Sequence, residues 1–181
     1  VKEDAGWKGY NTDCSGAIQA LETHLDLKDK NVLIIGSGGT AKAIGYGVVA
    51  KGANLTVTYN KNKERGVQLA KELDCRLASI RDIGDHDYDV VINCSPVGMN
   101  PNVDTTPFSN RNLKPGMVVF DSVYNPPETR LLKEAREAGC TVISGVELFI
   151  NQAVGQFEMW TRNKAPAQAM RDVLMEKIEG K

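Results

Sequence analysis

The stretch from Asn31 to Arg65, NVLIIGSGGTAKAIGYGVVAKGANLTVTYNKNKER, decides the fold of this 181-residue chain. It opens with an apolar run, Val32 to Ile35, that ends in a glycine-rich turn. A helical stretch over about residues 40–51 follows, and then a second β-rich run over 55–59 and a cationic loop. A buried strand, a glycine turn, a helix and a second strand are the parts of a βαβ unit, whose two strands are parallel.

The same alternation continues toward the C-terminus. We expect helices over residues 64–73, 128–138, 147–160 and 165–178, and strands over 75–78, 90–93, 117–121 and 141–144. A further amphipathic helix is expected to begin near residue 12, with Thr12 or Asp13 as its cap. Strands that alternate with helices predict an α/β protein. Its sheet would be doubly wound, parallel and of Rossmann type, with helices on both faces and flanking helices at each end.

Composition and charge restrict the partners. The chain is 41% hydrophobic and 25% charged, with a net charge of -1, so no overall field draws it to nucleic acid or to a membrane surface. No apolar run approaches the roughly 20 residues of a membrane span. The four cysteines are far apart and form no CxxC pair, so we expect reduced thiols and no metal site. A cytoplasmic protein is expected, or a plastid protein if the source is a plant.

The glycine turn fits the pattern G-x-G-x-x-G/A. Gly36 permits the tight turn, Gly38 lets the backbone approach a pyrophosphate, and Ala41 keeps the helix close to the strand. The N–H groups at the start of the helix would then face the phosphates. Glycine turns also occur in proteins that bind no dinucleotide, but the position between a strand and a helix favours a dinucleotide site. The candidate cofactor residues here are Gly36, Ser37, Gly38, Gly39, Thr40 and Ala41.

The loop after the second strand indicates which dinucleotide is bound. An NAD site usually has Asp or Glu there, and the S-adenosylmethionine site of a methyltransferase commonly has an acid as well. This chain instead has Asn60, Lys61, Asn62 and Arg65. Lys61 and Arg65 would attract a 2′-phosphate, and Arg65 can bind it with two parallel hydrogen bonds. The loop therefore predicts NADP, with a solvated basic helix start as the alternative.

Several motifs, in order along the chain, resemble those of the shikimate dehydrogenase family. They are residues 9–16 (GYNTDCSG), 36–43 (GSGGTAKA), 60–65 (NKNKER), 92–99 (INCSPVGM), 121–126 (DSVYNP) and 152–161 (QAVGQFEMWT). The resemblance implies NADPH-dependent reduction of 3-dehydroshikimate to shikimate, on the way to aromatic amino acids. It also implies an N-terminal substrate-binding domain with a catalytic lysine. This chain lacks that domain and begins at Val1 rather than Met, so we expect the natural protein to continue upstream.

The resemblance also implies roles for single residues. Asp13 matches the catalytic aspartate, which pairs with the absent lysine and also binds substrate. Hydride transfer to a ketone builds negative charge on its oxygen, so a proton donor must lie close by. Gln152 matches a substrate-contacting glutamine, and Tyr124 a tyrosine between nicotinamide and substrate. Without the match, these three would equally be a helix cap, a surface amide and a packed aromatic. The other cofactor positions implied are Asn93, Ser95 and Met99 beside the adenosine, Gly145 and Leu148 beside the nicotinamide, and Val123.

Two residues depart from the family pattern, because Lys61 replaces an arginine and Asn62 a threonine. Lysine lacks the planar fork of arginine, so the preference for NADP would be weaker. We expect residues 1–30 to connect to and border a substrate cleft, 31–146 to form the NADP-binding core, and 147–181 to pack back toward the cleft. The expected function is the NADP-binding domain of a shikimate dehydrogenase, with little or no activity alone.

Three alternatives stay open at this point. One is a quinate or quinate/shikimate dehydrogenase that uses NAD or NADP. Another is a non-catalytic nucleotide-binding module. A methyltransferase is disfavoured, because Asn60 stands where an acid would be expected. The sequence also leaves open whether the full-length enzyme forms a homodimer.

Overall fold

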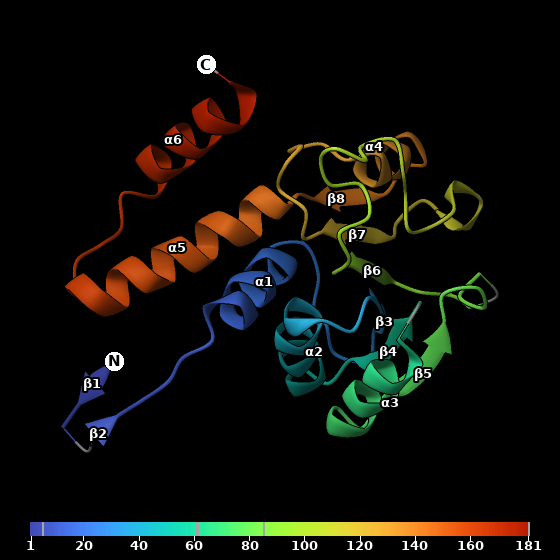
Figure 1. Ribbon diagram of the computed structural model, residues 1–181, viewed down its shortest axis with the longest axis horizontal. Helices are drawn as coiled ribbons and strands as arrows, with labels where there is room; N and C mark the ends of the chain where they lie inside the picture. The colour runs from blue at the N-terminus through green and yellow to red at the C-terminus, as the bar shows by residue number, and fades with distance from the viewer. Residues whose placement is uncertain (5, 61, 85, 181) are drawn as a thin grey trace.

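The computed structural model describes residues 1–4, 6–60, 62–84 and 86–180. Within these residues, six parallel strands form one sheet in the order β5-β4-β3-β6-β7-β8 (Figure 1). Counted from β3, this is the order 3-2-1-4-5-6 of a doubly wound dinucleotide-binding fold. The predicted fold class is therefore confirmed. The strands are β3 (Asn31–Ile35), β4 (Asn54–Tyr59), β5 (Arg76–Ser79), β6 (Val90–Asn93), β7 (Val118–Asp121) and β8 (Thr141–Ile143).

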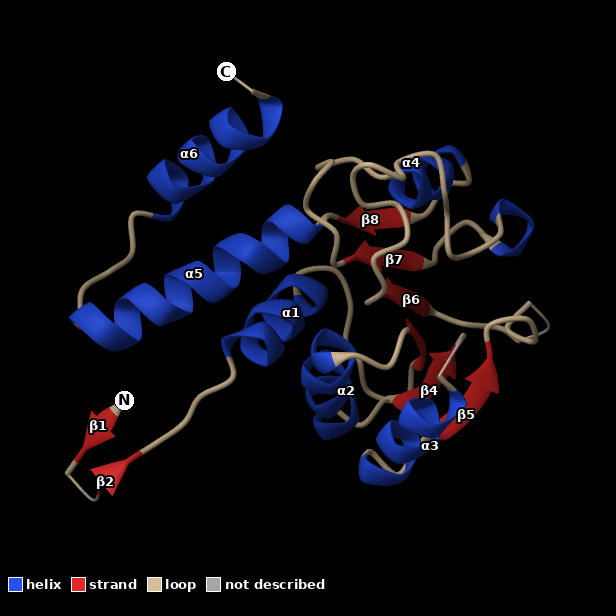
Figure 2. Ribbon diagram, viewed as in Figure 1, coloured by secondary structure: helices blue, strands red, loops and turns tan. Residues whose placement is uncertain are grey.

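The central strands are apolar almost without interruption because both faces of the sheet are covered. Every residue of β6 and β7 is buried, and so are four of the five residues of β3. On one face lie α1 (Thr12–Glu22), α2 (Gly39–Ala50) and α3 (Lys63–Glu72). On the other lie α4 (Arg130–Glu137) and the short 3-10 helix η1 (Asn110–Asn112) (Figure 2).

The two terminal regions extend away from the sheet. β1 (Lys2–Glu3) and β2 (Gly6–Trp7) pair antiparallel. The long helix α5 (Gly145–Thr161) starts at the sheet and runs beside α1 (Figure 1). The last helix, α6 (Ala167–Glu179), lies beyond α5. Arg171 of α6 donates two hydrogen bonds, of 2.7 and 2.6 Å, to the carboxylate of Glu147 on α5.

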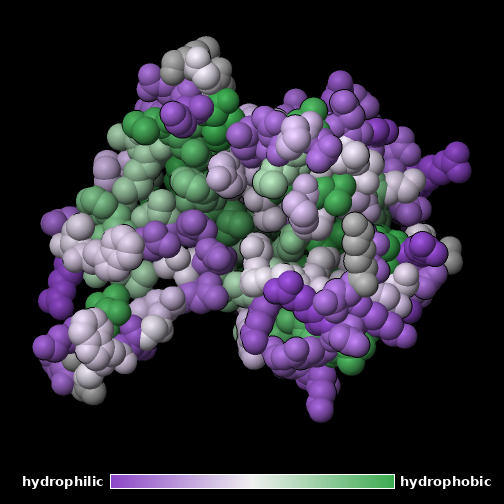
Figure 3. Space-filling view, viewed as in Figure 1, coloured by the Kyte–Doolittle hydropathy of each residue, from purple (hydrophilic) through white to green (hydrophobic). Residues whose placement is uncertain are grey.

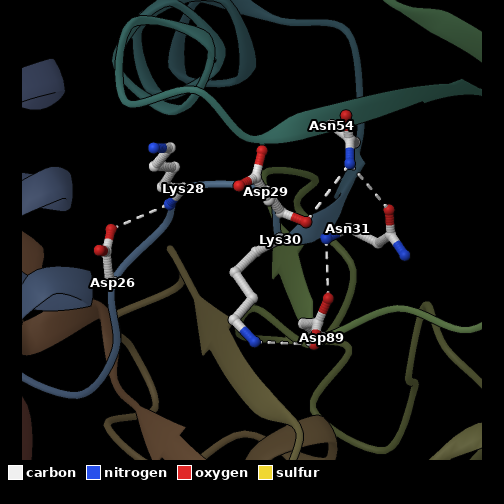
Figure 4. A network of polar contacts seen from close by, with 7 residues as sticks. All are labelled: Asp26, Lys28, Asp29, Lys30, Asn31, Asn54 and Asp89. Carbon is white, nitrogen blue, oxygen red and sulfur yellow. Dashed lines mark hydrogen bonds and ion pairs between the residues drawn. The ribbon is translucent and has the colours of Figure 1, made fainter.

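A polar network connects the amino ends of β3, β4 and β6, at the edge of the sheet away from the glycine turn (Figure 4). The carboxylate of Asp89 accepts a hydrogen bond from the backbone N–H of Asn31 at 2.8 Å and forms an ion pair with Lys30 at 3.4 Å. Asn54 donates to the backbone carbonyl of Asp29 and to the Asn31 side chain. These contacts fix the start of β3 and leave its carboxyl end free to form the site.

Neither a membrane span nor a metal centre is found in the described part of the chain. Each of its helices is too short or too polar to cross a bilayer. No group of three His, Cys, Asp or Glu side chains within the described residues is placed to hold a metal ion.

Candidate cofactor and substrate site

The crevice at the carboxyl ends of β3 and β6 is the point where the chain winds to opposite sides of the sheet. Gly36 ends β3 with φ +122°, a conformation that favours glycine. Its N–H donates to Thr58 Oγ1 at 3.1 Å, and a Cβ atom at this position would lie 2.9 Å from the carbonyl oxygen of Cys94. Glycine is therefore required here by both conformation and space. Ligands of doubly wound sheets bind at such a crevice.

The start of α2 offers an open anion-binding surface beside this turn. Gly38 caps the helix in an extended conformation, and the first turn contains no acidic residue. A Cβ atom on Gly38 or Gly39 would have no heavy atom within 4 Å, so the space above this backbone is free. The first N–H groups of a helix have no partner inside it and carry partial positive charge. Thr40 and Ala41 complete this first turn as the sequence predicts.

A cavity of about 260 Å³ lies between α2 and α3, next to the glycine turn. It brings Arg65, which was predicted to bind a 2′-phosphate, close to the turn. It also includes four residues that were not candidates from the sequence, namely Lys42, Gln68, Leu69 and Glu72. The lining residues are Ser37, Gly38, Gly39, Lys42, Arg65, Gln68, Leu69 and Glu72.

The cationic loop is used partly for structure. Asn62 caps α3, since its side-chain oxygen accepts a hydrogen bond from the N–H of Arg65 at 2.8 Å. One side of the Asn62 amide is thereby occupied, which limits its predicted role toward a cofactor. Asn60 is exposed directly after β4, and Arg65 is exposed in the first turn of α3. The predicted cofactor residue Lys61 lies outside the described residues.

A second cavity, of about 200 Å³, brings together side chains from four separate segments. Six of its residues were expected to bind substrate or cofactor, and Thr40 connects it to the start of α2. The Tyr124 and Phe149 rings pack against each other there, with centroids 5.0 Å apart. Ser122 was not expected and has no signal in the sequence beyond its place after a buried strand. The lining residues are Asp13, Thr40, Ser122, Tyr124, Gly145, Leu148, Phe149 and Gln152.

Asp13 does not cap α1. The cap is Asn11, whose side-chain oxygen accepts from the N–H of Cys14 at 3.1 Å. The sequence expectation of Thr12 or Asp13 as cap was wrong because Asn11, one residue earlier, already satisfies this donor. Thr12 instead accepts a hydrogen bond from Gln156 at 3.0 Å, which ties α5 to α1. Asp13 is half-buried in the first turn and lines the second cavity.

A buried network supports the loop after β7, which lines the second cavity. Asp121, at the end of β7, is fully buried and accepts from Asn93 at 2.9 Å, Thr129 at 2.7 Å and the N–H of Val123 at 3.0 Å. Burial raises the pKa of the Asp121 carboxyl to about 6, although these three hydrogen bonds lower it in part. Asp121 was not predicted from the sequence as a contributor to the site.

Several predicted cofactor positions belong to these supporting loops. Asn93 is fully buried, and its side-chain oxygen accepts from the N–H and hydroxyl of Ser95 at 3.0 and 2.7 Å. Asn93 therefore shapes the loop that was expected to border an adenosine, whereas Met99 of that loop is exposed. A Cβ atom on Gly145 would lie 2.3 Å from the carbonyl oxygen of Val123. Glycine there lets the start of α5 pack directly on the loop after β7.

Comparison with known proteins identifies relatives of the chain. The Shikimate / quinate 5-dehydrogenase family profile matches residues 18–121, and the Shikimate 5'-dehydrogenase C-terminal domain profile matches residues 145–175. The NADP(+) shikimate dehydrogenase of Methanosarcina acetivorans is 39% identical over 183 aligned positions. That alignment covers 95% of this chain and 65% of the relative, so the chain spans less than two thirds of its length.

Solved structures show the same architecture. A shikimate dehydrogenase in complex with NADP+ is 33% identical, with a TM-score of 0.85 over 97% of this chain and 64% of that chain. A quinate dehydrogenase from Corynebacterium glutamicum in complex with NAD is 31% identical, with a TM-score of 0.86 over 97% of this chain and 66% of that chain.

Proposed function

The chain belongs to the shikimate / quinate 5-dehydrogenase family, and from this we propose that it is the NADP-binding part of a shikimate dehydrogenase. The whole enzyme would reduce 3-dehydroshikimate to shikimate. One observation carries the proposal. The second cavity joins the candidate substrate residues Asp13, Gln152 and Tyr124 to Thr40, at the helix start where a dinucleotide would bind.

The residues present fit a dinucleotide at the crevice. The open backbone at Gly38 and Gly39 would receive the pyrophosphate, and Arg65 would bind the 2′-phosphate. When bound, NADPH supplies the hydride for a ketone. Gly145, Leu148 and Phe149 would line the nicotinamide end of the cofactor.

This chain's own residues would bind and orient the substrate. Gln152 offers both donors and an acceptor to substrate hydroxyls, and the Asp13 carboxylate accepts hydrogen bonds from them. The Tyr124 and Phe149 rings would exclude water from one side of the cavity. We propose that Asp13 also orients the proton donor, for which the family resemblance implies a lysine in a substrate-binding domain. Catalysis then needs a group that the chain does not supply.

We propose that the chain is divided between a cofactor-binding core and terminal segments that border the substrate cleft. Residues 1–30 and 147–181 would border the substrate cleft, and residues 31–146 would bind NADP. None of the α6 residues whose burial is described is buried, and Val173 is 66% exposed. Figure 3 shows hydrophobic residues gathered along α6 and the part of α5 next to it. We propose that a substrate-binding domain beyond this chain covers this surface.

Titration calorimetry of the chain with NADP and with NAD tests the cofactor assignment. We expect NADP to bind more tightly. Arg65→Ala should raise the Kd for NADP about tenfold or more and leave that for NAD unchanged, because a charge-assisted contact contributes about 1.5–3 kcal/mol. Lys133→Ala, which removes an exposed cation on α4, is the control. Equal affinities for NADP and NAD that do not depend on Arg65 would overturn the assignment.

Turnover provides the second test. With shikimate and NADP, the isolated chain should form NADPH far more slowly than an intact shikimate dehydrogenase, because the lysine is missing. A rate equal to that of the intact enzyme would show that this chain holds a complete catalytic site.

A quinate dehydrogenase that uses NAD is the second candidate. It is favoured by the similarity to the Corynebacterium glutamicum enzyme and by the use of Asn62 as a helix cap rather than as a free phosphate ligand. Tighter binding of NAD than of NADP in the same titration would support this candidate over the first.

A further inference from the structure

An ion pair stands in the wall of the cavity that holds Arg65. Lys42 Nζ, on α2, lies 2.5 Å from Glu72 Oε2, on α3. The other carboxylate oxygen of Glu72 accepts a hydrogen bond from Gln68 at 3.0 Å. Both contacts lower the pKa of Glu72, and Glu72 raises the pKa of Lys42, so both groups are charged at neutral pH. The carboxylate is therefore held in place by two partners, next to the candidate 2′-phosphate site.

One of the two positive charges in this cavity is offset by a carboxylate. Arg65 and Lys42 are cationic, Glu72 is anionic, and no ion pair of Arg65 occurs among the described residues. A 2′-phosphate would therefore meet one net positive charge, the sum of the two cations and the carboxylate that repels it. The same carboxylate holds Lys42 in an ion pair, although the flexible lysine stem allows Nζ to move to a phosphate.

We propose that the Lys42–Glu72 pair sets the discrimination between NADP and NAD. Lys42 would bind the 2′-phosphate when its Nζ moves away from Glu72, and Glu72 would limit this contribution to NADP affinity. The inference rests on the proposed dinucleotide site and deepens it. NAD has no 2′-phosphate, so it would occupy the same crevice without sensing this pair. The pair thus acts on the ratio of the two affinities.

The net charge of the cavity predicts an order of NADP affinity for four proteins: the wild type, Glu72→Gln, Lys42→Ala and the double variant with both substitutions. Glu72→Gln leaves two unopposed cations, so NADP should bind about three- to tenfold more tightly than to the wild type, as expected for one charge within several ångströms. Lys42→Ala leaves Glu72 unpaired and should weaken NADP binding by a similar factor. The double variant keeps one net positive charge and should resemble the wild type. The Kd for NAD should stay within about twofold throughout, because only the 2′-phosphate lies near the pair.

A second ion pair of the same helix provides the matched control. Lys51, at the end of α2, lies 2.6 Å from Glu22 of α1, and its exposure is similar, at 44% and 40% for the two side chains against 50% and 30%. Lys51→Ala and Glu22→Gln remove the same charges far from the cavity. They should leave both affinities unchanged. Thermal unfolding of every variant shows whether the folded state is retained.

The measurement is titration calorimetry of the whole chain with NADP and NAD at low and high salt. The predicted order, with differences that shrink as salt rises, supports the inference. If NADP binds through Arg65 but all four proteins have equal NADP affinity, the ion pair is only structural and the inference fails. If the wild type binds neither cofactor, the proposed function itself fails. A loss of affinity for both NAD and NADP in Lys42→Ala would also overturn the inference that the pair discriminates between them.

Discussion

At the scale of single residues, Asp121 shows how a buried charge can organise a site without touching a ligand. Its carboxylate joins the loop after β6, the loop after β7 and the cap of α4, through Asn93, Val123 and Thr129. An ionised carboxylate can accept all three donors at once, whereas an unpaired buried charge would be strongly unfavourable. Burial without a cation explains why the pKa of Asp121 is raised rather than lowered.

This raised pKa predicts a definite pH dependence of stability. Between about 4, the ordinary pKa, and about 6, the folded state binds the proton more tightly than the unfolded state does. The contribution of Asp121 to stability therefore falls as pH rises through this range, by up to about 3 kcal/mol. Asp121→Asn cannot titrate and should lack this decline.

Urea unfolding of both proteins from about pH 4 to pH 7 measures the difference directly. The free energy of unfolding of the Asn variant should increase relative to that of the wild type as pH rises through the range. Other groups, such as Glu72 and Asp87 with their lowered pKa values, titrate in both proteins and cancel. A difference that does not change with pH would show that Asp121 titrates at its ordinary pKa.

At the scale of elements, α1 and α2 approach closely through a glycine. A Cβ atom on Gly47 would lie 2.5 Å from Cγ1 of Ile18 and 2.9 Å from the sulfur of Cys14. With a side chain at position 47, the two helices could not keep their present separation. That separation helps to hold Asp13 over the start of α2. The position carries no recognisable motif, so its role depends entirely on the packing.

Gly47→Ala should accordingly destabilise the fold. Overpacking costs about 1–3 kcal/mol and should outweigh the helix-propensity gain of up to about 1 kcal/mol. Gly155→Ala in α5 is the control, since its Cβ would meet Thr12 at an ordinary 3.7 Å and only the propensity gain should remain. Chemical denaturation measures both changes. A Gly47 variant as stable as the control would mean that α1 and α2 can separate at little cost.

At the scale of the whole molecule, the chain consists of a well-packed core and a loosely attached end. The core includes the sheet, α1 to α4 and the start of α5, where side chains such as Leu148 are buried. By contrast, α6 is joined to α5 by the Arg171–Glu147 pair and has no buried residue among those whose burial is described. Partly exposed ion pairs contribute little, so α6 has few stabilising contacts within this chain.

Hydrogen exchange should reveal this difference in stability. Amides of α6 should exchange far faster than those of α2 and β3, because local opening of α6 exposes little apolar surface. Mass spectrometry of the exchanged chain would measure it. Addition of NADP should slow exchange at the start of α2 and leave α6 unaffected. Equal protection of α6 and α2 would mean that the chain alone stabilises α6.

The sequence by itself determined the fold class and the location of the dinucleotide crevice. Apolar runs such as Val32 to Ile35 and the turn at Gly36 are local signals, and their spacing along the chain identifies a doubly wound sheet. Gly36 was predictable because a tight turn at the end of a buried strand favours glycine. The family motifs added Asp13, Tyr124 and Gln152 as candidates, but no local pattern showed that they share a cavity.

Only the tertiary structure decided how these residues meet. The cap at Asn11, the hydrogen bonds to Asp121 and the pairing of Lys42 with Glu72 each depend on side-chain geometry, and the last two join residues from different elements. Periodicity and spacing report which face of an element is buried, but not which polar group of another element it will contact. The sequence therefore indicated where a cofactor would bind, and the packing of α1, α2, α3 and α5 determined the charges and side chains that would surround it.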